Sequence, residues 1–168
     1  EFLEGKGLSN EVNIRIFCYE PENEMVVRHF VNQLETDQSL NCHLIVCNLY
    51  KTFLSICDDM DITDVIPDME EADGSDYLLE QLNSAIGNRE FIDKIQYEPH
   101  EPGDVLMLTG VGEVFPFMRI HTLLEALQPY FSNVPILVMY PGEFDGRHVK
   151  LFNRLTPNDY YRAFNVID

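Results

Sequence analysis

Apolar residues in this chain occur in two patterns, as short continuous runs and as stripes at helical spacing. Runs of about four to eight apolar or β-branched residues are typical of buried strands, whereas repeats every three or four positions indicate a helix with one buried face. The runs predict strands over residues 12–19, 43–49, 104–109 and 134–140. The stripes predict helices that begin at Pro21, cover residues 50–57, 77–86 and 88–96, and begin again near Pro116.

This alternation of strands and helices predicts an α/β fold. Parallel strands joined by right-handed crossovers form a sheet with helices on its faces. The nearly continuous apolar run over residues 43–49 suits a strand covered on both faces. We therefore predict a single three-layer α/β domain over residues 1–168, with a mostly parallel sheet flanked by helices. Residues 151–155 and 160–167 read as an extended pair that adds a C-terminal edge strand or hairpin.

The stretch over residues 58–76 interrupts the pattern, because acidic residues accumulate there without a basic one. Its acids are Asp58, Asp59, Asp61, Asp64, Asp68, Glu70, Glu71, Asp73 and Asp76. Charge runs usually form solvated surface. Pro67 and Gly74 within this run are typical of loops and turns. We predict an exposed acidic insertion.

The net charge of the chain bears on whether nucleic acid is a partner. The chain has 29 acidic and 11 basic residues, which gives a net charge of −18. Proteins that bind DNA or RNA draw much of their affinity from Lys and Arg side chains that neutralise phosphates. The charge therefore argues against direct nucleic-acid binding.

The spacing of the cysteines and the length of the apolar runs indicate in which cellular compartment the protein works. The four cysteines form no Cys-x-x-Cys pair, which is typical of buried free thiols in a reducing cytosol. No apolar run approaches the roughly 18 residues of a membrane-spanning helix, and no signal peptide is visible. We expect a cytoplasmic protein without membrane contact. The chain begins at Glu1 without an initiator Met, which suggests that a native N-terminal segment precedes it.

The most site-like stretch covers residues 106–121, where a buried strand ends in a glycine turn that leads into a helix. In an open α/β sheet, ligands bind outside the carboxyl ends of the strands. We expect Glu113 to cap this helix, with its start near Pro116. The candidate contact residues of the turn are Gly110, Gly112, Glu113, Phe115, Arg119 and His121.

A nucleotide site at this turn is the alternative prediction. The phosphate-binding pattern Gly-x4-Gly-Lys-Ser/Thr is absent, and Phe115 occupies the position of the third glycine in a dinucleotide motif. Glu113 follows the glycines directly and would repel phosphate. These features favour a packing role for the glycines, and leave a degenerate nucleotide-binding or nucleotide-sensing domain as the second hypothesis.

No catalytic, cofactor-binding or metal-binding residue is predicted. The Gly-x-Ser-x-Gly elbow of hydrolases and the EF-hand loop are both absent. His100 with Glu98 and Glu101 is a conceivable metal set, but a solvated surface is favoured. A hydrolase built from Glu20, Glu113 and His121 is the weakest hypothesis.

The C-terminal tail carries a different signal, because aromatic residues alternate with arginines there. Tyr and Arg are enriched at the hot spots of protein interfaces. We expect Arg154, Tyr160, Tyr161 and Arg162 to contact a partner protein. The competing interpretation is an edge strand that packs its aromatic face on the sheet.

Four co-linear motifs resemble the BrxB family. They are GKGLSNEV at residues 5–12, LTGVGEVFPFMRIH at 108–121, MYPGEFDG at 139–146, and LFNRL with DYYRAF at 151–155 and 159–164. The resemblance implies a component of BREX, the bacteriophage-exclusion defence systems, which combine a methyltransferase, a large ATPase and a PglZ-type phosphatase-like protein with small accessory proteins. No catalytic activity is established for the family. We expect a non-catalytic accessory subunit that docks onto a larger protein such as one of PglZ type, with its oligomeric state left open.

Overall fold

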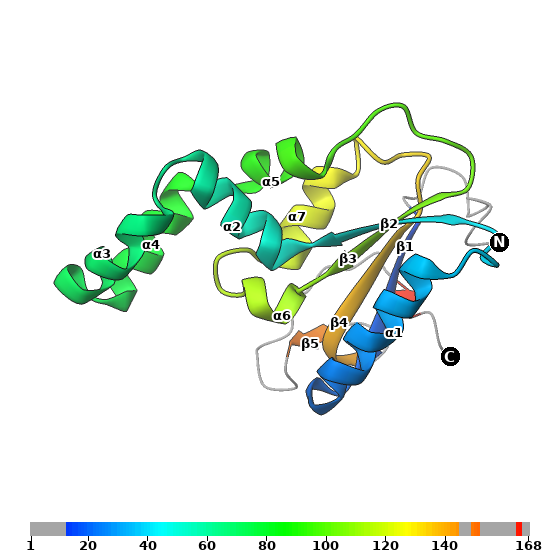
Figure 1. Cartoon of the computed structure of the whole chain (residues 1–168), viewed down its shortest axis with the longest axis horizontal. Coiled ribbons are helices and arrows are strands. Elements are labelled where there is room, and N and C mark those ends of the chain that lie inside the picture. The colour runs from blue at the N-terminus through cyan, green and yellow to red at the C-terminus, as the bar shows by residue number, and fades with distance from the viewer. Residues whose placement is uncertain (1–12, 145–148, 152–163, 166–168) are drawn as a thin grey trace.

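The computed structural model describes residues 13–144, 149–151 and 164–165 and confirms the α/β prediction (Figure 1). Four of the strands alternate with helices along the chain. The strands are β1 (Ile14–Tyr19), β2 (His43–Asn48), β3 (Asp104–Thr109), β4 (Ile136–Phe144), β5 (Val149–Leu151) and β6 (Phe164–Asn165). The helices are α1 (Glu24–Thr36), α2 (Leu49–Asp59), α3 (Ile66–Asp73), α4 (Ser75–Ala85), α5 (Asn88–Ile95), α6 (Val111–Val114) and α7 (Ile120–Leu127).

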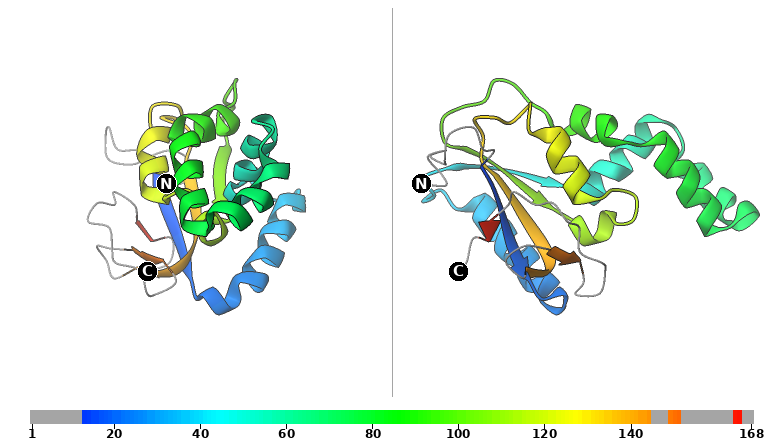
Figure 2. Two further views of the ribbon diagram at one scale, coloured as in Figure 1. Left: turned by 90° about the vertical axis from the view of Figure 1, so that its left-hand side faces the viewer. Right: turned by 180° about the vertical axis from the view of Figure 1, so that it is seen from behind.

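The sheet has the strand order β2-β3-β4-β1-β6, and all of these neighbours are parallel. The chain crosses from β1 to the far edge at β2 and then returns through β3 to β4. Right-handed crossovers in opposite directions place their helices on opposite faces. Helix α1 therefore covers one face, and α2, α5, α6 and α7 cover the other (Figures 1 and 2).

The two faces differ in how completely they are buried. On the many-helix face, a large core includes the fully buried Phe91, Leu106 and Phe131. On the α1 face, Val31 packs against Met107 and Met139 in a much smaller cluster. Burial of apolar side chains is the main stabilising term in folding. Most of this stabilisation therefore comes from the many-helix face.

The glycine turn differs from its prediction. Helix α6 begins directly after Gly110, and α7 begins only at Ile120, so the expected helix start near Pro116 is wrong. Phe115, which precedes a proline, is extended and ends α6, as residues in that position tend to do. Phe117 lies in the loop between α6 and α7, and its ring stacks on Phe53 with the centroids 4.5 Å apart.

The last strands also differ from the prediction. Strand β4 does not end before Pro141-Gly142 but continues to Phe144 and forms a hairpin with β5. Pro141 lies beyond the last residue pair that joins β4 to β3, which is Leu108 with Val138. A proline is tolerated there because one side of the strand has no ladder partner. Strand β6 is a parallel edge strand next to β1, whereas residues 152–163 of the predicted extended pair lie outside the described residues.

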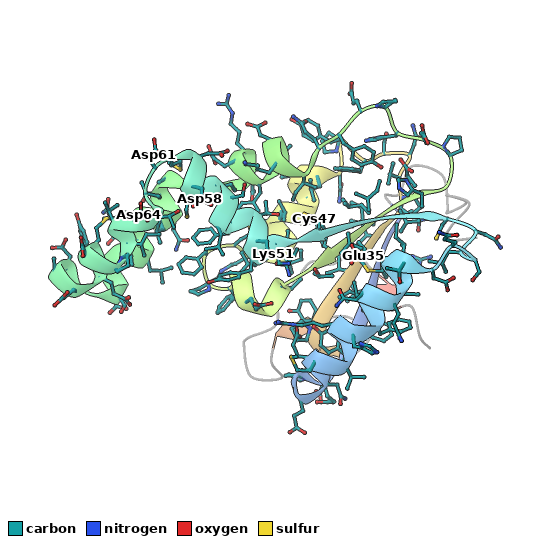
Figure 3. The ribbon with its side chains drawn as sticks, in the orientation of Figure 1. Glu35, Cys47, Lys51, Asp58, Asp61 and Asp64 are labelled. Atoms are coloured by element: carbon teal, nitrogen blue, oxygen red, sulfur yellow. The ribbon has the colours of Figure 1, made fainter. Side chains whose placement is uncertain are left out.

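The acidic stretch over residues 58–76 is exposed but largely helical. A 3-10 turn (Thr63–Val65) leads into α3, and Gly74 with a φ of +88° joins α3 to α4. Ile66 and Met69 pack against the core, whereas the acids face outward. The two helices extend away from the sheet, as Figure 1 shows, and Figure 3 labels Asp58, Asp61 and Asp64 along this arm.

Candidate functional site

A cavity of about 640 Å³ opens between α1 on one side and α2 and α5 on the other. It follows the edge strand β2 and reaches the carboxyl ends of β1 and β3, and we call it the β2 groove. Figure 3 labels three residues of its lining, Glu35 on α1, Cys47 on β2 and Lys51 on α2. The charged lining residues are Glu24, Arg28, Glu35, Lys51, Lys94 and Glu113.

The winding of the sheet explains why the groove lies here. After β1 the chain turns to one face to form α1, whereas after β2 and β3 it turns to the other face to form α2 and α6. The helices that follow these strands therefore lie on opposite faces of the sheet, and the groove reaches the carboxyl ends of the strands, which is where open α/β sheets bind their ligands. The predicted glycine turn lies in this groove.

Asn48 and Gly110 hold the two turns at the carboxyl ends of β2 and β3 together. The Asn48 side-chain oxygen accepts the Lys51 backbone N–H at 3.0 Å and so caps α2. Gly110 has a φ of +71°, and a Cβ added there would lie 2.6 Å from Asn48 Oδ1 and 3.2 Å from the Tyr50 backbone nitrogen. A glycine at this position thus permits both the left-handed backbone and the close approach of the capping side chain.

Arg28 bridges two carboxylates at the mouth of the groove. Its Nε donates to Glu24 Oε1 at 2.9 Å, and its Nη2 donates to Glu113 Oε1 at 2.6 Å. The Tyr19 hydroxyl donates to the other oxygen of Glu24 at 2.5 Å. The hydrogen bond to Glu24 raises the pKa of Arg28 further above its ordinary range. This network links α1 to the glycine turn through ion pairs that are partly solvated, since the Arg28 side chain is 45% exposed.

Two groups that could serve as nucleophiles are held in their protonated forms. Burial, together with the hydrogen bond to the Glu24 carboxylate, raises the pKa of Tyr19. Burial also raises the pKa of the Cys47 thiol and outweighs the opposite effect of its hydrogen bond with Thr52. A thiol above its ordinary pKa is a weak nucleophile at neutral pH. Neither group is activated for covalent catalysis.

Charges along the groove balance, unlike those of the whole chain. Three acidic and three basic side chains line it, whereas the chain carries a net charge of −18. The Lys94 ammonium pairs with Asp59 at 2.6 Å and contacts Ser55 Oγ at 2.9 Å. Within the described residues, the side chains of Glu35 and Lys51 have no hydrogen-bond or ion-pair partner. These two charges remain available to a ligand.

The predicted contact residues separate into three groups. Gly110 and Glu113 line the groove. Gly112 lies within α6, Phe115 packs against the core, Arg119 precedes α7 and His121 lies in its first turn; none of these four lines the groove. The tail residues Arg154, Tyr160, Tyr161 and Arg162 lie outside the described residues.

Several residues of the groove escaped prediction from the sequence. Glu113 is bridged through Arg28 to Glu24. The four-residue spacing of Glu24 and Arg28 on a helix is a recognisable signal for their pair. Asn48, at the junction of a strand and a helix, is a recognisable N-cap. No local signal identifies the contact of Arg28 with Glu113, which are 85 positions apart.

At the opposite end of β3, a buried carboxylate holds the start of the strand in place. Asp104 is 4% exposed and accepts hydrogen bonds from the Tyr97 hydroxyl at 2.8 Å and the Glu101 N–H at 2.9 Å. Its other oxygen lies 2.9 Å from His43 Nδ1. Burial opposes ionisation of Asp104, but these hydrogen bonds outweigh it and lower its pKa. The distance from the groove marks this carboxylate as a structural feature.

In the described part of the chain, no three His, Cys, Asp or Glu side chains are placed to hold a metal ion. His100, considered above as a metal ligand, stacks on Phe131 with a centroid separation of 5.2 Å. Nor does any helix in the described ranges have the length and apolar character needed to cross a membrane.

Comparison with known proteins gives a consistent result. The family model for BrxB, described as BREX protein BrxB, matches residues 45–166. A BREX protein BrxB of Bacillus cereus (strain H3081.97) is 37% identical over 174 residues, covering 99% of this chain and 90% of the relative. A BREX protein BrxB of Escherichia coli O9:H4 (strain HS) is 27% identical over 171 residues, covering 99% of this chain and 84% of the relative. No solved structure matches the chain.

Proposed function

The chain belongs to the BrxB family of BREX proteins, and we propose that it acts as a non-catalytic accessory subunit of a BREX antiphage defence complex. In this proposal it works in the cytoplasm and docks onto a larger protein, with a PglZ-type protein as the candidate partner. The aligned region covers 99% of the chain, so it includes the segments that form the groove and the glycine turn.

Exposed apolar side chains on α1 are the observation that carries the docking proposal. Met25, Val26 and Phe30 are 72%, 67% and 47% exposed. Val26 and Phe30 are four positions apart on the helix and therefore share a flank. Large apolar side chains that gather on one surface mark sites of protein interaction. The tail residues Arg154, Tyr160, Tyr161 and Arg162 are proposed as further contacts.

The chemistry of the groove supports a non-catalytic role. Tyr19 and Cys47 are held protonated, and the arginine in the groove mouth is already bound to Glu24 and Glu113. A nucleotide at the glycine turn would bring its phosphates close to Glu113, and like charges at short range repel. The nucleotide hypothesis stays a prediction, and titration calorimetry of the chain with ATP, GTP and NAD tests it.

Co-purification tests the proposal. The tagged chain, co-expressed with the remaining genes of its BREX operon, is expected to elute from size-exclusion chromatography together with the PglZ-type protein. If it elutes alone at every salt concentration, the docking proposal is wrong. An untagged preparation serves as the control for adsorption to the resin.

A further inference from the structure

Strand β2 is an edge strand with one open side. Among the described residues it pairs only with β3. The His43 N–H donates to the Gly103 carbonyl oxygen at 2.8 Å, which shows that the backbone groups of His43 face β3. Backbone groups of alternate residues in a strand point the same way. The N–H and C=O of Leu44 and Val46 therefore face the open side.

Within the described residues, strand β2 itself carries no sequence feature that blocks pairing at an edge. Natural proteins shield edge strands with lysine, proline, bulges, very short strands or a covering helix or loop. Strand β2 has the six-residue sequence HLIVCN, without proline, glycine or lysine. Its open side faces the β2 groove instead, between Asn32 and Glu35 of α1 and Thr52 and Ser55 of α2.

We propose that the β2 groove receives an extended peptide segment of the partner protein, which pairs with β2 as an additional strand. The inference rests on the proposed docking function and specifies how the docking occurs. Strand addition satisfies the backbone groups of Leu44 and Val46, and main-chain hydrogen bonds supply affinity in this recognition mode. An unpaired row of N–H and C=O groups selects an extended backbone over other ligands, because only a strand matches its spacing.

Glu35 and Lys51, whose side chains have no partner among the described residues, predict the polarity of this segment. Helix α1 connects the parallel strands β1 and β2, so it runs antiparallel to β2 and its last turn, with Glu35, lies toward the start of that strand. Lys51 follows the carboxyl end of β2. Figure 3 shows Glu35 and Lys51 on opposite sides of Cys47. The bound segment is thus expected to carry a basic residue toward the His43 end and an acidic residue toward the Asn48 end.

A single peptide fits the groove better than a second copy of this chain. The edge lies between helices of both layers, and the same walls would stand beside the edge of the second copy. Pairing two such edges at the strand spacing of about 4.8 Å would bring the helices of both copies together, whereas a single peptide carries no such walls. A dimer through β2 is therefore an outcome that contradicts the proposal.

Residue-resolved amide hydrogen exchange tests the proposal. The full chain is measured alone and in complex with the PglZ-type protein of its operon. Strand addition predicts at least tenfold slower exchange for Leu44 and Val46 in the complex, and unchanged slow exchange for Ile45 and Cys47, which already face β3. If the complex forms and Leu44 and Val46 exchange as in the free chain, strand addition is wrong while docking stands. If the wild-type chain does not associate at all, both proposals fail.

Variants supply an independent readout. Val46→Pro removes one outward N–H without removing a hydrogen bond to β3, and a proline is compatible with an edge strand. Lys51→Glu reverses an exposed charge in the groove, and Arg89→Glu, an exposed position of α5 outside the groove lining, is its control. Tenfold or greater weakening by Lys51→Glu and by folded Val46→Pro is expected, with no change for Arg89→Glu. If Lys51→Glu binds the PglZ-type protein with wild-type affinity, the predicted polarity is wrong. If the free chain is a dimer in which the Leu44 amide is protected from exchange, the proposal of a partner peptide is wrong.

Discussion

The side chain of Asn48 occupies the space that a Cβ at Gly110 would need. The side-chain oxygen would lie 2.6 Å from that atom, while it also caps α2 through the Lys51 N–H. The two residues are far apart in the sequence but join the turns that follow β2 and β3. Helix capping and the glycine turn are therefore parts of one structural unit, which forms one end of the β2 groove.

This contact predicts non-additive effects of two substitutions. Gly110→Ala is expected to lower the free energy of unfolding by about 2 kcal/mol or more, because the left-handed backbone alone costs an alanine about 1–2 kcal/mol. Asn48→Ala should cost about 1 kcal/mol through loss of the cap. In the Asn48→Ala background, Gly110→Ala should cost less, since the side chain it meets is gone. Urea unfolding of the four proteins measures the coupling, and strictly additive losses contradict the contact.

The buried carboxylate Asp104 predicts a pH dependence. Its pKa is lowered in the folded state from the ordinary value of 3.8, so its stabilising contribution is complete above that pH. The contribution is lost as the pH falls through the folded pKa. Asp104→Asn is expected to lower the free energy of unfolding by about 2 kcal/mol at pH 7. The gap between the two proteins should shrink below pH 3.8, and an equal gap at pH 7 and pH 2.5 in urea unfolding contradicts this account.

The Arg28 bridge predicts a small effect that depends on salt. The side chains of Arg28 and Glu113 are 45% and 36% exposed, and exposed ion pairs contribute about 0–1 kcal/mol. Arg28→Ala should therefore lower the free energy of unfolding by less than about 1 kcal/mol in low salt. In 1 M NaCl, where charges are screened within about 3 Å, most of that loss should disappear. A loss of several kcal/mol that persists in high salt would show that Arg28 has a packing role instead.

The exposed flank of α1 predicts a specific defect in association. Phe30→Ala is expected to weaken binding to the PglZ-type protein by tenfold or more. Truncation of an aromatic hot-spot residue typically costs about 2 kcal/mol or more of binding free energy. Tyr77→Ala is a matched control, since Tyr77 is an aromatic residue with the same 47% exposure but lies on α4. Surface plasmon resonance compares the two variants. Equal affinity of Phe30→Ala and the wild-type chain would exclude this flank from the interface.

The strands of the parallel sheet core can be predicted because a continuous apolar run indicates a strand that is buried in the sheet. The apolar run at residues 104–109 predicts a strand, and these residues form β3, whose first five residues are buried. The similar run at residues 43–49 predicted a strand covered on both faces, yet β2 lies at the edge of the sheet and its residues are only half-buried or exposed. Strand order depends on contacts between distant segments, and a single strand's apolar pattern does not record it.

The acidic arm shows a different limit. The nine acids of residues 58–76 favour a prediction of exposed surface and give no sign of a helix. The local signals of a helix are Pro67 in the first turn of α3, and Ile66 and Met69, which pack against the core.

Part of the groove is predictable from the sequence. Gly110 and Glu113 follow a strand, and that position predicts them as contact residues. Arg28, Lys51 and Glu35 have no such signal, because they line the groove only once the fold brings α1 and α2 to either side of β2.

The most direct test of the central claim is a calorimetric titration of the purified full chain with the purified PglZ-type protein of the same BREX operon. The account predicts saturable binding with a defined stoichiometry and a negative heat-capacity change, because apolar surface on α1 becomes buried. The absence of binding heat at every temperature, with both proteins folded and the mixture eluting as two separate species, would contradict it.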